Sequence, residues 1–316
     1  MATTTPTVNK RYPKYGWHNI KRDFKLNYAL TLMILPVFAF YIIFHYGPMY
    51  GLQIAFRDYN PVDGVTGSPW VGLKHFISFF NNFYFGRLIR NTLLISVETL
   101  VFGFPAPIIF AILLNEIRTS WYKRTLQTLS YLPYFISTVV MCGIIVNFTR
   151  SDGVINDIIA LFGGERKTML QYPQYFRPVY VISGIWQSLG WNSIIYLAAI
   201  SGIDMQLYEA AKIDGAGRFA QVFHVTIPSI APTIIILFIL RMGSMFSVGS
   251  DKVLLLYNSA TYETADVIST YVYRRGILDG DFSFSAAVGL FNSLINFFLI
   301  IITNKVSSMV SETSLW

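Results

Sequence analysis

Six apolar segments recur along the chain and are separated by polar stretches. They cover residues 26–47, 91–114, 126–148, 179–200, 230–249 and 286–303. A helix of about 20 residues is about 30 Å long, which matches the hydrocarbon core of a bilayer. The pattern therefore predicts an all-α integral membrane protein with six transmembrane helices.

Composition supports a membrane protein and argues against a soluble domain. Of the 316 residues, 53% are hydrophobic and 13% are charged, whereas soluble domains carry about 25% charged residues. The single cysteine, Cys142, lies within an apolar segment and cannot form an intrachain disulfide. The composition therefore indicates neither a soluble fold nor a disulfide framework.

Basic residues predict which side of the membrane each connection occupies. The net charge is +7, and six basic residues crowd into residues 10–25, directly before the first apolar segment. Such a cluster is typical of a cytoplasmic flank rather than of a nucleic-acid site. The short basic connection 115–125 belongs on the same side. An even number of spans then places both termini in the cytoplasm, and the long connections 48–90, 149–176 and 250–282 outside.

This topology divides the chain into three parts. Residues 1–26 form a basic cytoplasmic segment, whose Thr/Pro-rich start we expect to be disordered. Residues 27–304 form the transmembrane domain, which includes a cytoplasmic hairpin at 204–228. Residues 305–316 form a cytoplasmic tail.

The hairpin at 204–228 is a long polar interruption between the apolar segments 179–200 and 230–249. Asp204 can cap a short helix, which Asp214 and Gly215 can end. We expect a second short helical turn after it, stopped by Pro228. Such a hairpin has little apolar surface of its own to bury, which favours docking into another protein. The alternative is an ordinary cytoplasmic connector rich in helix-forming residues.

The spacing of the hairpin residues carries a resemblance. The sequence Glu209-Ala210-Ala211, followed by Gly215 and by VTIP at 225–228, resembles the EAA–G–IxLP loop of ABC importer permeases. In that family the loop is the coupling helix that fits a cleft on the ATP-hydrolysing subunit. The resemblance therefore implies a coupling role for Glu209, Ala210, Ala211, Asp214 and Gly215.

The resemblance extends over nearly the whole chain after residue 26. The stretches FHYGPMYGLQIAFRDYN, FGFPAPIIFAILLNE and GWNSIIYLAAISGID are similar to type I ABC importer permeases of the carbohydrate-uptake branch, most of all to LplB-type polysaccharide permeases. The implied partners are a second homologous permease, two ATP-binding subunits with ATP and magnesium, and an extracellular or periplasmic solute-binding protein. The implied substrate is an oligosaccharide or polysaccharide. Residues 247–256 depart most from that group, which often has Glu-Gln near Asp251 and Lys252, and this departure concerns substrate identity.

Two ionisable residues lie within predicted spans, where an unpaired charge costs several kcal/mol. Counting about 1.5 Å per residue from the span ends places Glu98 and Arg241 at similar depths. We therefore hypothesise an intramembrane Glu98–Arg241 ion pair. The alternative is that each faces a water-filled cavity separately.

Polar and aromatic side chains within two spans are candidates for a substrate path. They are Trp186, Gln187, Trp191 and Asn192 in the fourth span, and Asn292 and Asn296 in the last. Amides can bind sugar hydroxyls, and aromatic rings can stack on apolar sugar faces. Hydrogen bonding and packing between helices is the alternative explanation for each of them.

Other signals argue against catalysis in this chain. No GxxxxGK[ST] phosphate loop is present, so ATP would be hydrolysed by partner subunits, and we expect no enzyme activity and no cofactor here. The four histidines are scattered without the spacing of metal ligands, so no metal site is expected. The main alternative function is a secondary transporter driven by an ion gradient, which would be expected to show inverted repeats and a buried ion site.

Overall fold

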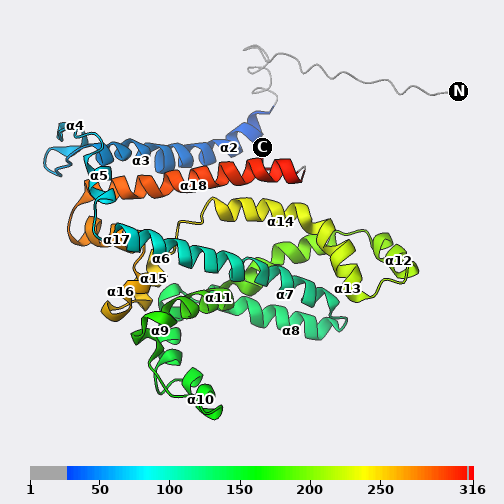
Figure 1. Ribbon diagram of the computed structural model, residues 1–316. Helices are drawn as coiled ribbons and strands as arrows, with labels where there is room; N and C mark the ends of the chain where they lie inside the picture. The colour runs from blue at the N-terminus through cyan, green and yellow to red at the C-terminus, as the bar shows by residue number, and fades with distance from the viewer. Residues whose placement is uncertain (1–26, 312) are drawn as a thin grey trace. The chain divides into compact units, whose positions relative to one another are not determined.

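The computed structural model describes residues 27–311 and 313–316 (Figure 1). The predicted basic segment 1–26 lies outside the described residues. The chain divides into two compact units, Met1–Gln53 and Ile54–Trp316. The described residues are helical or irregular, with a single isolated β-bridge between Arg57 and Trp70. The predicted all-α class is confirmed.

The first unit contains one long apolar helix. Helix α2 (Tyr28–Tyr41) continues through a π-helical turn, η1 (Ile42–Tyr46), and α3 (Gly47–Met49) into a 3-10 turn, η2 (Tyr50–Phe56). No residue of α2 is buried, and apolar side chains cover its whole circumference. A helix that is apolar all round needs lipid or another protein around it. The first predicted span is thus confirmed, and it is longer than the apolar pattern suggested.

The second predicted span is a helix of 32 residues, Phe85–Glu116. It consists of α6 (Phe85–Glu98), a π-helical turn η3 (Thr99–Gly103) and α7 (Pro105–Glu116). The prolines that follow Gly103 cannot donate a backbone hydrogen bond, and the wider π-helical turn accommodates the break.

The prediction that the third span is one continuous helix over 126–148 was wrong. The chain instead forms α8 (Ser120–Tyr131), a 3-10 turn η4 (Leu132–Phe135) and a separate helix α9 (Thr138–Thr149). Pro133 interrupts the first helix, and the side chain of Ser137 caps the next by accepting a hydrogen bond from the N–H of Val140.

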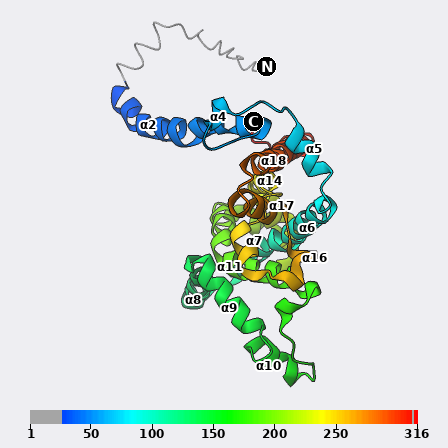
Figure 2. The same ribbon diagram turned by 90° about the vertical axis from the view of Figure 1, so that its left-hand side faces the viewer.

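The predicted external connections contain further short helices. They are α4 (Gly64–Gly67), α5 (Lys74–Phe80), α10 (Val154–Leu161), η5 (Met169–Gln171), α15 (Ser250–Leu256), η7 (Ser259–Thr261), α16 (Tyr262–Ala265), α17 (Ile268–Tyr273) and η8 (Arg274–Leu278). Helix α10 projects away from the remainder of the second unit in both views (Figures 1 and 2). The segment 250–282 is not a loose loop, because its helices pack against α6, α9, α11 and α18.

The central element of the second unit is α11 (Pro173–Ser201), which packs against α7, α8, α14, α15 and α16. It contains the fourth predicted span. By length and composition, five helical stretches of the described residues are long and apolar enough to cross a membrane: Tyr28–Phe56, Phe85–Glu116, Thr138–Leu161 (α9 together with α10), Arg218–Met242 and Phe282–Val310. Helix α11 is long enough but carries amide and hydroxyl side chains among its apolar residues, which lowers its hydropathy. Because α11 lies at the centre of the packed helices, we count it as one further spanning helix, which brings the number to six.

The last two spans are α14 (Ile227–Met242) and α18 (Phe282–Val310), which pack against each other. The hairpin helix α12 (Met205–Ile213) and the connection from α7 to α8 lie at one end of the second unit (Figure 1). Helices α15, α16 and α17 lie at the opposite end. This arrangement agrees with the predicted assignment of these connections to two sides of the membrane.

Helix α11 packs closely against α8 at Gly190. A Cβ atom at this position would overlap with the carbonyl oxygen of Ser130 and would lie 2.8 Å from its hydroxyl oxygen. The close packing of these two helices therefore requires glycine at position 190.

We predict that Gly190→Ala lowers the free energy of unfolding by about 1–3 kcal/mol, because the added methyl group forces α8 and α11 apart. The measurement is thermal unfolding of the detergent-solubilised protein. Gly143→Ala in α9 is the matched control, since its added Cβ meets no atom within 4 Å, and it should leave stability unchanged or slightly higher. Equal melting temperatures for wild type and Gly190→Ala would contradict the packing described here.

Candidate functional site

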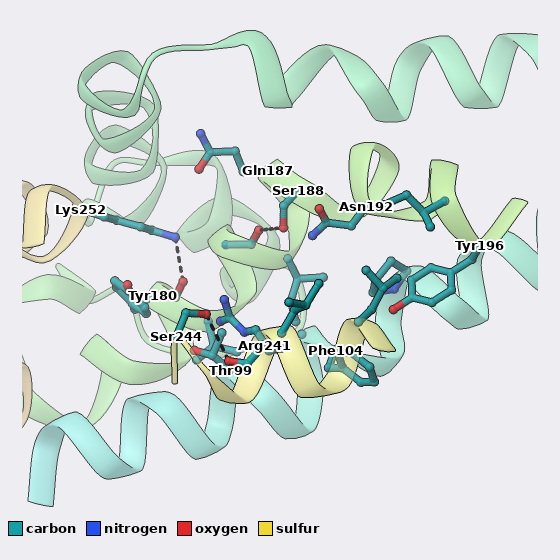
Figure 3. A pocket seen from close by; sticks show the side chains of 18 residues that line it. Thr99, Phe104, Tyr180, Gln187, Ser188, Asn192, Tyr196, Arg241, Ser244 and Lys252 are labelled. Atoms are coloured by element: carbon teal, nitrogen blue, oxygen red, sulfur yellow. Dashed lines mark hydrogen bonds between the residues drawn. The ribbon is translucent and has the colours of Figure 1, made fainter. Parts of the chain in front are cut away.

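A cavity of about 550 Å³ lies within the second unit, between η3, α7, α11, α14 and α15 (Figure 3). Its wall is formed by Thr99, Gly103, Phe104, Pro107, Tyr180, Val181, Gly184, Ile185, Gln187, Ser188, Asn192, Ile195, Tyr196, Leu237, Leu240, Arg241, Ser244 and Lys252. The wall combines amides, hydroxyls, three aromatic rings and two cations, and it contains no carboxylate.

Helix α11 supplies most of the polar groups of the wall. Gln187, Ser188 and Asn192 follow one another along this helix and line the same side of the cavity (Figure 3). The hydroxyl of Ser188 donates to the carbonyl oxygen of Gly184 at 2.8 Å. Amides offer both donors and acceptors, so this side of the wall can bind a ligand with many hydroxyl groups.

The two cations enter the cavity from different helices. Lys252 of α15 donates from Nζ to the carbonyl oxygen of Tyr180 at 2.9 Å, and its Nζ lies 4.7 Å from the centre of the Tyr180 ring. Burial lowers the pKa of Lys252 to about 8, so the ammonium form still prevails at neutral pH. Arg241 comes from the last turn of α14. Within the described chain, neither cation has a carboxylate oxygen within 4 Å.

The structure does not bring the hypothesised Glu98–Arg241 pair together. Among residues 27–311 and 313–316, no ion pair joins these two side chains, and Glu98 instead lies near enough to Arg177 to stabilise its charge. The depth of a residue along a helix does not fix the direction in which its side chain points. Arg241 lines the cavity, whereas Glu98 does not.

Two of the six predicted path residues, Gln187 and Asn192, line the cavity. The two tryptophans of the same helix do not. Trp191 stacks on the ring of Tyr134 with a centroid distance of 4.5 Å, and Trp186 is 45% exposed. The tryptophans therefore lie on other faces of α11.

The two predicted path residues of α18, Asn292 and Asn296, connect this helix to its neighbours. Asn296 accepts from the N–H of Phe246 at 2.9 Å and donates to the hydroxyl of Ser247 at 3.0 Å. Asn292 donates to the carbonyl oxygen of Phe246 at 3.4 Å. Both amides thus fix α18 to the turn that follows α14, which corresponds to the alternative of hydrogen bonding between helices.

Lys252 and Tyr180 are cavity residues that the apolar pattern did not reveal. Lys252 belongs to a segment predicted as an external connection, and α15 folds that segment back against α9 and α11. The run VLLL directly after Lys252 was the available signal, because four consecutive apolar residues seldom lie in an exposed loop.

A buried carboxylate organises the segment that carries α15. Asp266 is fully buried, and its carboxylate accepts from Arg274 at 2.7 and 2.8 Å and from Arg87 at 3.2 Å. The hydroxyl of Thr270 donates to it at 2.8 Å. Arg87 belongs to α6, so this cluster ties the segment 250–282 to the second predicted span. We call Asp266, Arg87, Arg274 and Thr270 the Asp266 cluster.

The Asp266 cluster is connected to the helix that carries Lys252. Helix α17, which follows Asp266, packs against α15. The hydroxyl of Ser269 in α17 donates to the carbonyl oxygen of Val248 at 3.0 Å, just before α15 begins. The cluster therefore contributes to the position of the cavity wall.

The hairpin has the predicted capped helix. The side chain of Asp204 accepts from the N–H of Gln206 at 2.9 Å and caps α12. At the other end Gly215 has φ of 79°, and its N–H bonds to the carbonyl oxygen of Lys212 at 3.0 Å. The N–H of Ala216 bonds to the carbonyl oxygen of Ala211 at 2.8 Å, which completes a Schellman motif. Glycine is favoured at position 215 because other residues rarely adopt this backbone conformation.

The predicted stop at Pro228 was wrong. Helix α13 (Arg218–Gln221) continues through a π-helical turn, η6 (Val222–Thr226), directly into α14. The hydroxyls of Tyr208 and Thr226 are hydrogen-bonded at 2.9 Å, so α12 is fixed to the start of this long helix.

The hairpin exposes its three carboxylates, Asp204, Glu209 and Asp214, and several large apolar side chains. Ala210 is also exposed. Ile213 is 86% exposed and Phe219 is 83% exposed, although both lie in a polar connection. Exposed apolar side chains beside charged ones are typical of a surface that another protein covers.

The sequence is similar to a family of transport proteins and to individual members of known transport systems. Residues 103–311 match the family model described as binding-protein-dependent transport system inner membrane component. The chain is 44% identical over 288 residues to the polygalacturonan/rhamnogalacturonan transport system permease protein YteP of Bacillus subtilis (strain 168), covering 91% of this chain and 90% of that protein. It is also 44% identical over 288 residues to protein LplB of the same organism, covering 91% of both chains.

A solved structure shares the fold. The chain resembles, with a TM-score of 0.85 and 40% identity, a chain of a bacterial ABC transporter involved in the import of the acidic polysaccharide alginate. The match covers 92% of this chain and 99% of that chain.

We predict that Asp266→Asn lowers the free energy of unfolding by about 3–5 kcal/mol, because it leaves Arg87 and Arg274 without their buried counter-charge. Thermal unfolding of the purified protein measures the change. Asp58→Asn is the control, since Asp58 forms an ion pair with Lys74 in which both side chains are about half exposed, and it should change stability little. Similar melting temperatures for the two variants would show that the Asp266 cluster is not needed for stability.

Proposed function

Because the chain belongs to the binding-protein-dependent transport system inner membrane components, the permeases of ABC importers, we propose that it forms a transmembrane path for a saccharide. We further propose that ATP hydrolysis by partner subunits drives the alternation of this path between its two openings. In this proposal ATP and magnesium bind to the partners, and the present chain contributes no catalytic group.

The cavity wall supports a saccharide as the substrate. Sugar hydroxyls need both donors and acceptors, which Gln187, Ser188 and Asn192 supply. Sugar rings also have apolar faces that stack on aromatic rings such as those of Phe104 and Tyr196. The names of the relatives point the same way, since they refer to polygalacturonan, rhamnogalacturonan and alginate.

The exposed hairpin is the observation that carries the coupling proposal. It presents a carboxylate, Glu209, together with the apolar side chains of Ile213 and Phe219, at the end of the unit where α7 joins α8. A cleft on an ATP-binding subunit would cover these apolar groups and could pair Glu209 with a basic side chain. The proposed topology places the hairpin and both termini in the cytoplasm.

The proposed complex contains a second homologous permease, two ATP-binding subunits and a solute-binding protein. The solved relative has also been crystallised with an alginate pentasaccharide-bound periplasmic protein, which supports delivery of the substrate from outside. A secondary transporter driven by an ion gradient is less well supported. Its coupling ion would need carboxylate or similar oxygen ligands, whereas the cavity wall contains two cations and no carboxylate.

We predict that Glu209→Lys and Gly215→Pro each lower ATP-driven uptake at least about tenfold while leaving the amount of protein in the membrane unchanged. Lysine reverses the exposed charge offered to the ATP-binding subunit, and proline cannot adopt the positive φ of Gly215. The measurement is uptake and ATP hydrolysis by the complete transporter in proteoliposomes.

Glu165→Lys is the matched control, because Glu165 is 83% exposed and lies in the segment predicted to be external. This variant should retain ATP-driven uptake. Normal uptake by Glu209→Lys and Gly215→Pro would overturn the coupling proposal.

A further inference from the structure

We propose that the cavity selects saccharides that carry carboxylate groups, and that Arg241 and Lys252 bind those carboxylates. This inference rests on the proposed function, and it assigns a substrate class and two specificity residues to that path.

The charge of the wall is the first argument. Among its 18 residues are two cations, and no aspartate or glutamate is present. Lys252 is half-buried and Arg241 is exposed, and the described residues place no opposite charge beside either, so both cations act on whatever occupies the cavity. A neutral saccharide would need only hydroxyl and amide partners, so two cations without counter-charges indicate an anionic ligand.

Lys252 has N–H donors that no described acceptor uses. One of its three N–H groups donates to the carbonyl oxygen of Tyr180, and no other acceptor is hydrogen-bonded to Nζ in the described part of the chain. A Cβ atom on Gly184 would lie 3.2 Å from this Nζ. The glycine of α11 therefore leaves space beside the ammonium group, and this space belongs to the cavity.

Arg241 supplies the second cation. Its guanidinium forms no hydrogen bond with any described residue, although five N–H groups are available. The planar guanidinium matches the geometry of a carboxylate and can bind both oxygens at once. Figure 3 shows Arg241 and Lys252 at the same end of the cavity, away from Tyr196.

A hydroxyl beside Arg241 also lacks a partner. The Oγ1 atom of Thr99 is buried, forms no hydrogen bond with the described residues, and belongs to the cavity wall. Buried hydroxyls without a partner are uncommon in folded proteins. Figure 3 shows Thr99 beside Arg241, so this end of the wall is polar.

Nearby carboxylates do not compensate the two cations. Glu98 precedes Thr99 in the chain but lies outside the wall. Its negative charge instead favours the charged form of Arg177. Asp251 precedes Lys252 and accepts a hydrogen bond from the hydroxyl of Ser250 at 3.3 Å. Neither is within 4 Å of Arg241 or Lys252, so the cations remain available to a ligand.

The test measures saccharide binding to the complete transporter without nucleotide and without the solute-binding protein, by ligand-observed NMR. The probes are trigalacturonate and the same trisaccharide with its carboxyl groups reduced to alcohols. We expect the wild type to bind trigalacturonate at least about tenfold more tightly than the neutral probe. Lys252→Gln and Arg241→Gln should each reduce this preference about tenfold, and Lys252→Arg and Arg241→Lys should largely retain it.

Lys167→Gln and Arg150→Gln are the matched controls, since both residues are about half exposed in the predicted external segment. They should leave the preference unchanged. Equal binding of the two probes to the wild type, or an unchanged preference in Lys252→Gln and Arg241→Gln, would overturn the inference. Loss of assembly of the complex in Arg241→Gln, rather than loss of preference, would overturn the role of Arg241.

ATP-driven uptake by the wild type separates this inference from the function on which it rests. Uptake of the neutral trisaccharide at the rate of trigalacturonate would overturn the inference and leave the importer proposal intact. Absence of ATP-driven uptake for every saccharide tested would overturn the proposed function, and the inference with it.

Discussion

The buried carboxylate of Asp266 is the interaction on which the cavity end of the molecule depends. A buried charge is tolerated only when opposite charges and hydrogen bonds surround it, and Arg87, Arg274 and Thr270 supply them. Because Arg87 comes from α6, satisfying this one carboxylate draws the segment between α14 and α18 over the end of the bundle. Helix α15 is part of that segment, so the same constraint brings Lys252 to α11.

A second constraint is backbone hydrogen bonding around proline. The π-helical turns η1, η3 and η6 each end two residues before a proline, at Pro48, Pro105 and Pro228. Proline lacks an N–H and its ring clashes with the carbonyl group four residues earlier, so a normal α-helix would break or kink there. A wider turn relieves the clash while the helix continues. In a membrane this matters more than in water, because freed backbone groups find no solvent partner.

These constraints explain how far the sequence could predict the structure. The apolar segments predicted the helical class and most of the long helices, and Asp204 with Asp214 and Gly215 predicted a capped helix that a glycine terminates. Apolar periodicity cannot distinguish a stop at Pro228 from a continuing helix with a π-helical turn. It also cannot place 250–282, since that fold depends on the distant partner Arg87. Depth along a span suggested a Glu98–Arg241 pair, but rotation about the helix axis decides which residues meet.

The hairpin and the cavity are linked by the two helices that lead into and away from the hairpin. Helix α11 ends at Ser201, just before α12, and carries Tyr180, Gln187 and Asn192 on the cavity wall. Helix α14 continues from the hairpin through η6 and carries Arg241 in its last turn. The Tyr208–Thr226 hydrogen bond fixes α12 to this second helix. In the proposed mechanism, a displacement of α12 by an ATP-binding subunit would therefore move two walls of the cavity together. Lys252 of α15 is hydrogen-bonded to the Tyr180 carbonyl oxygen of α11, and Arg241 belongs to α14. Both proposed carboxylate-binding residues therefore lie on or against the two helices that the hairpin would move.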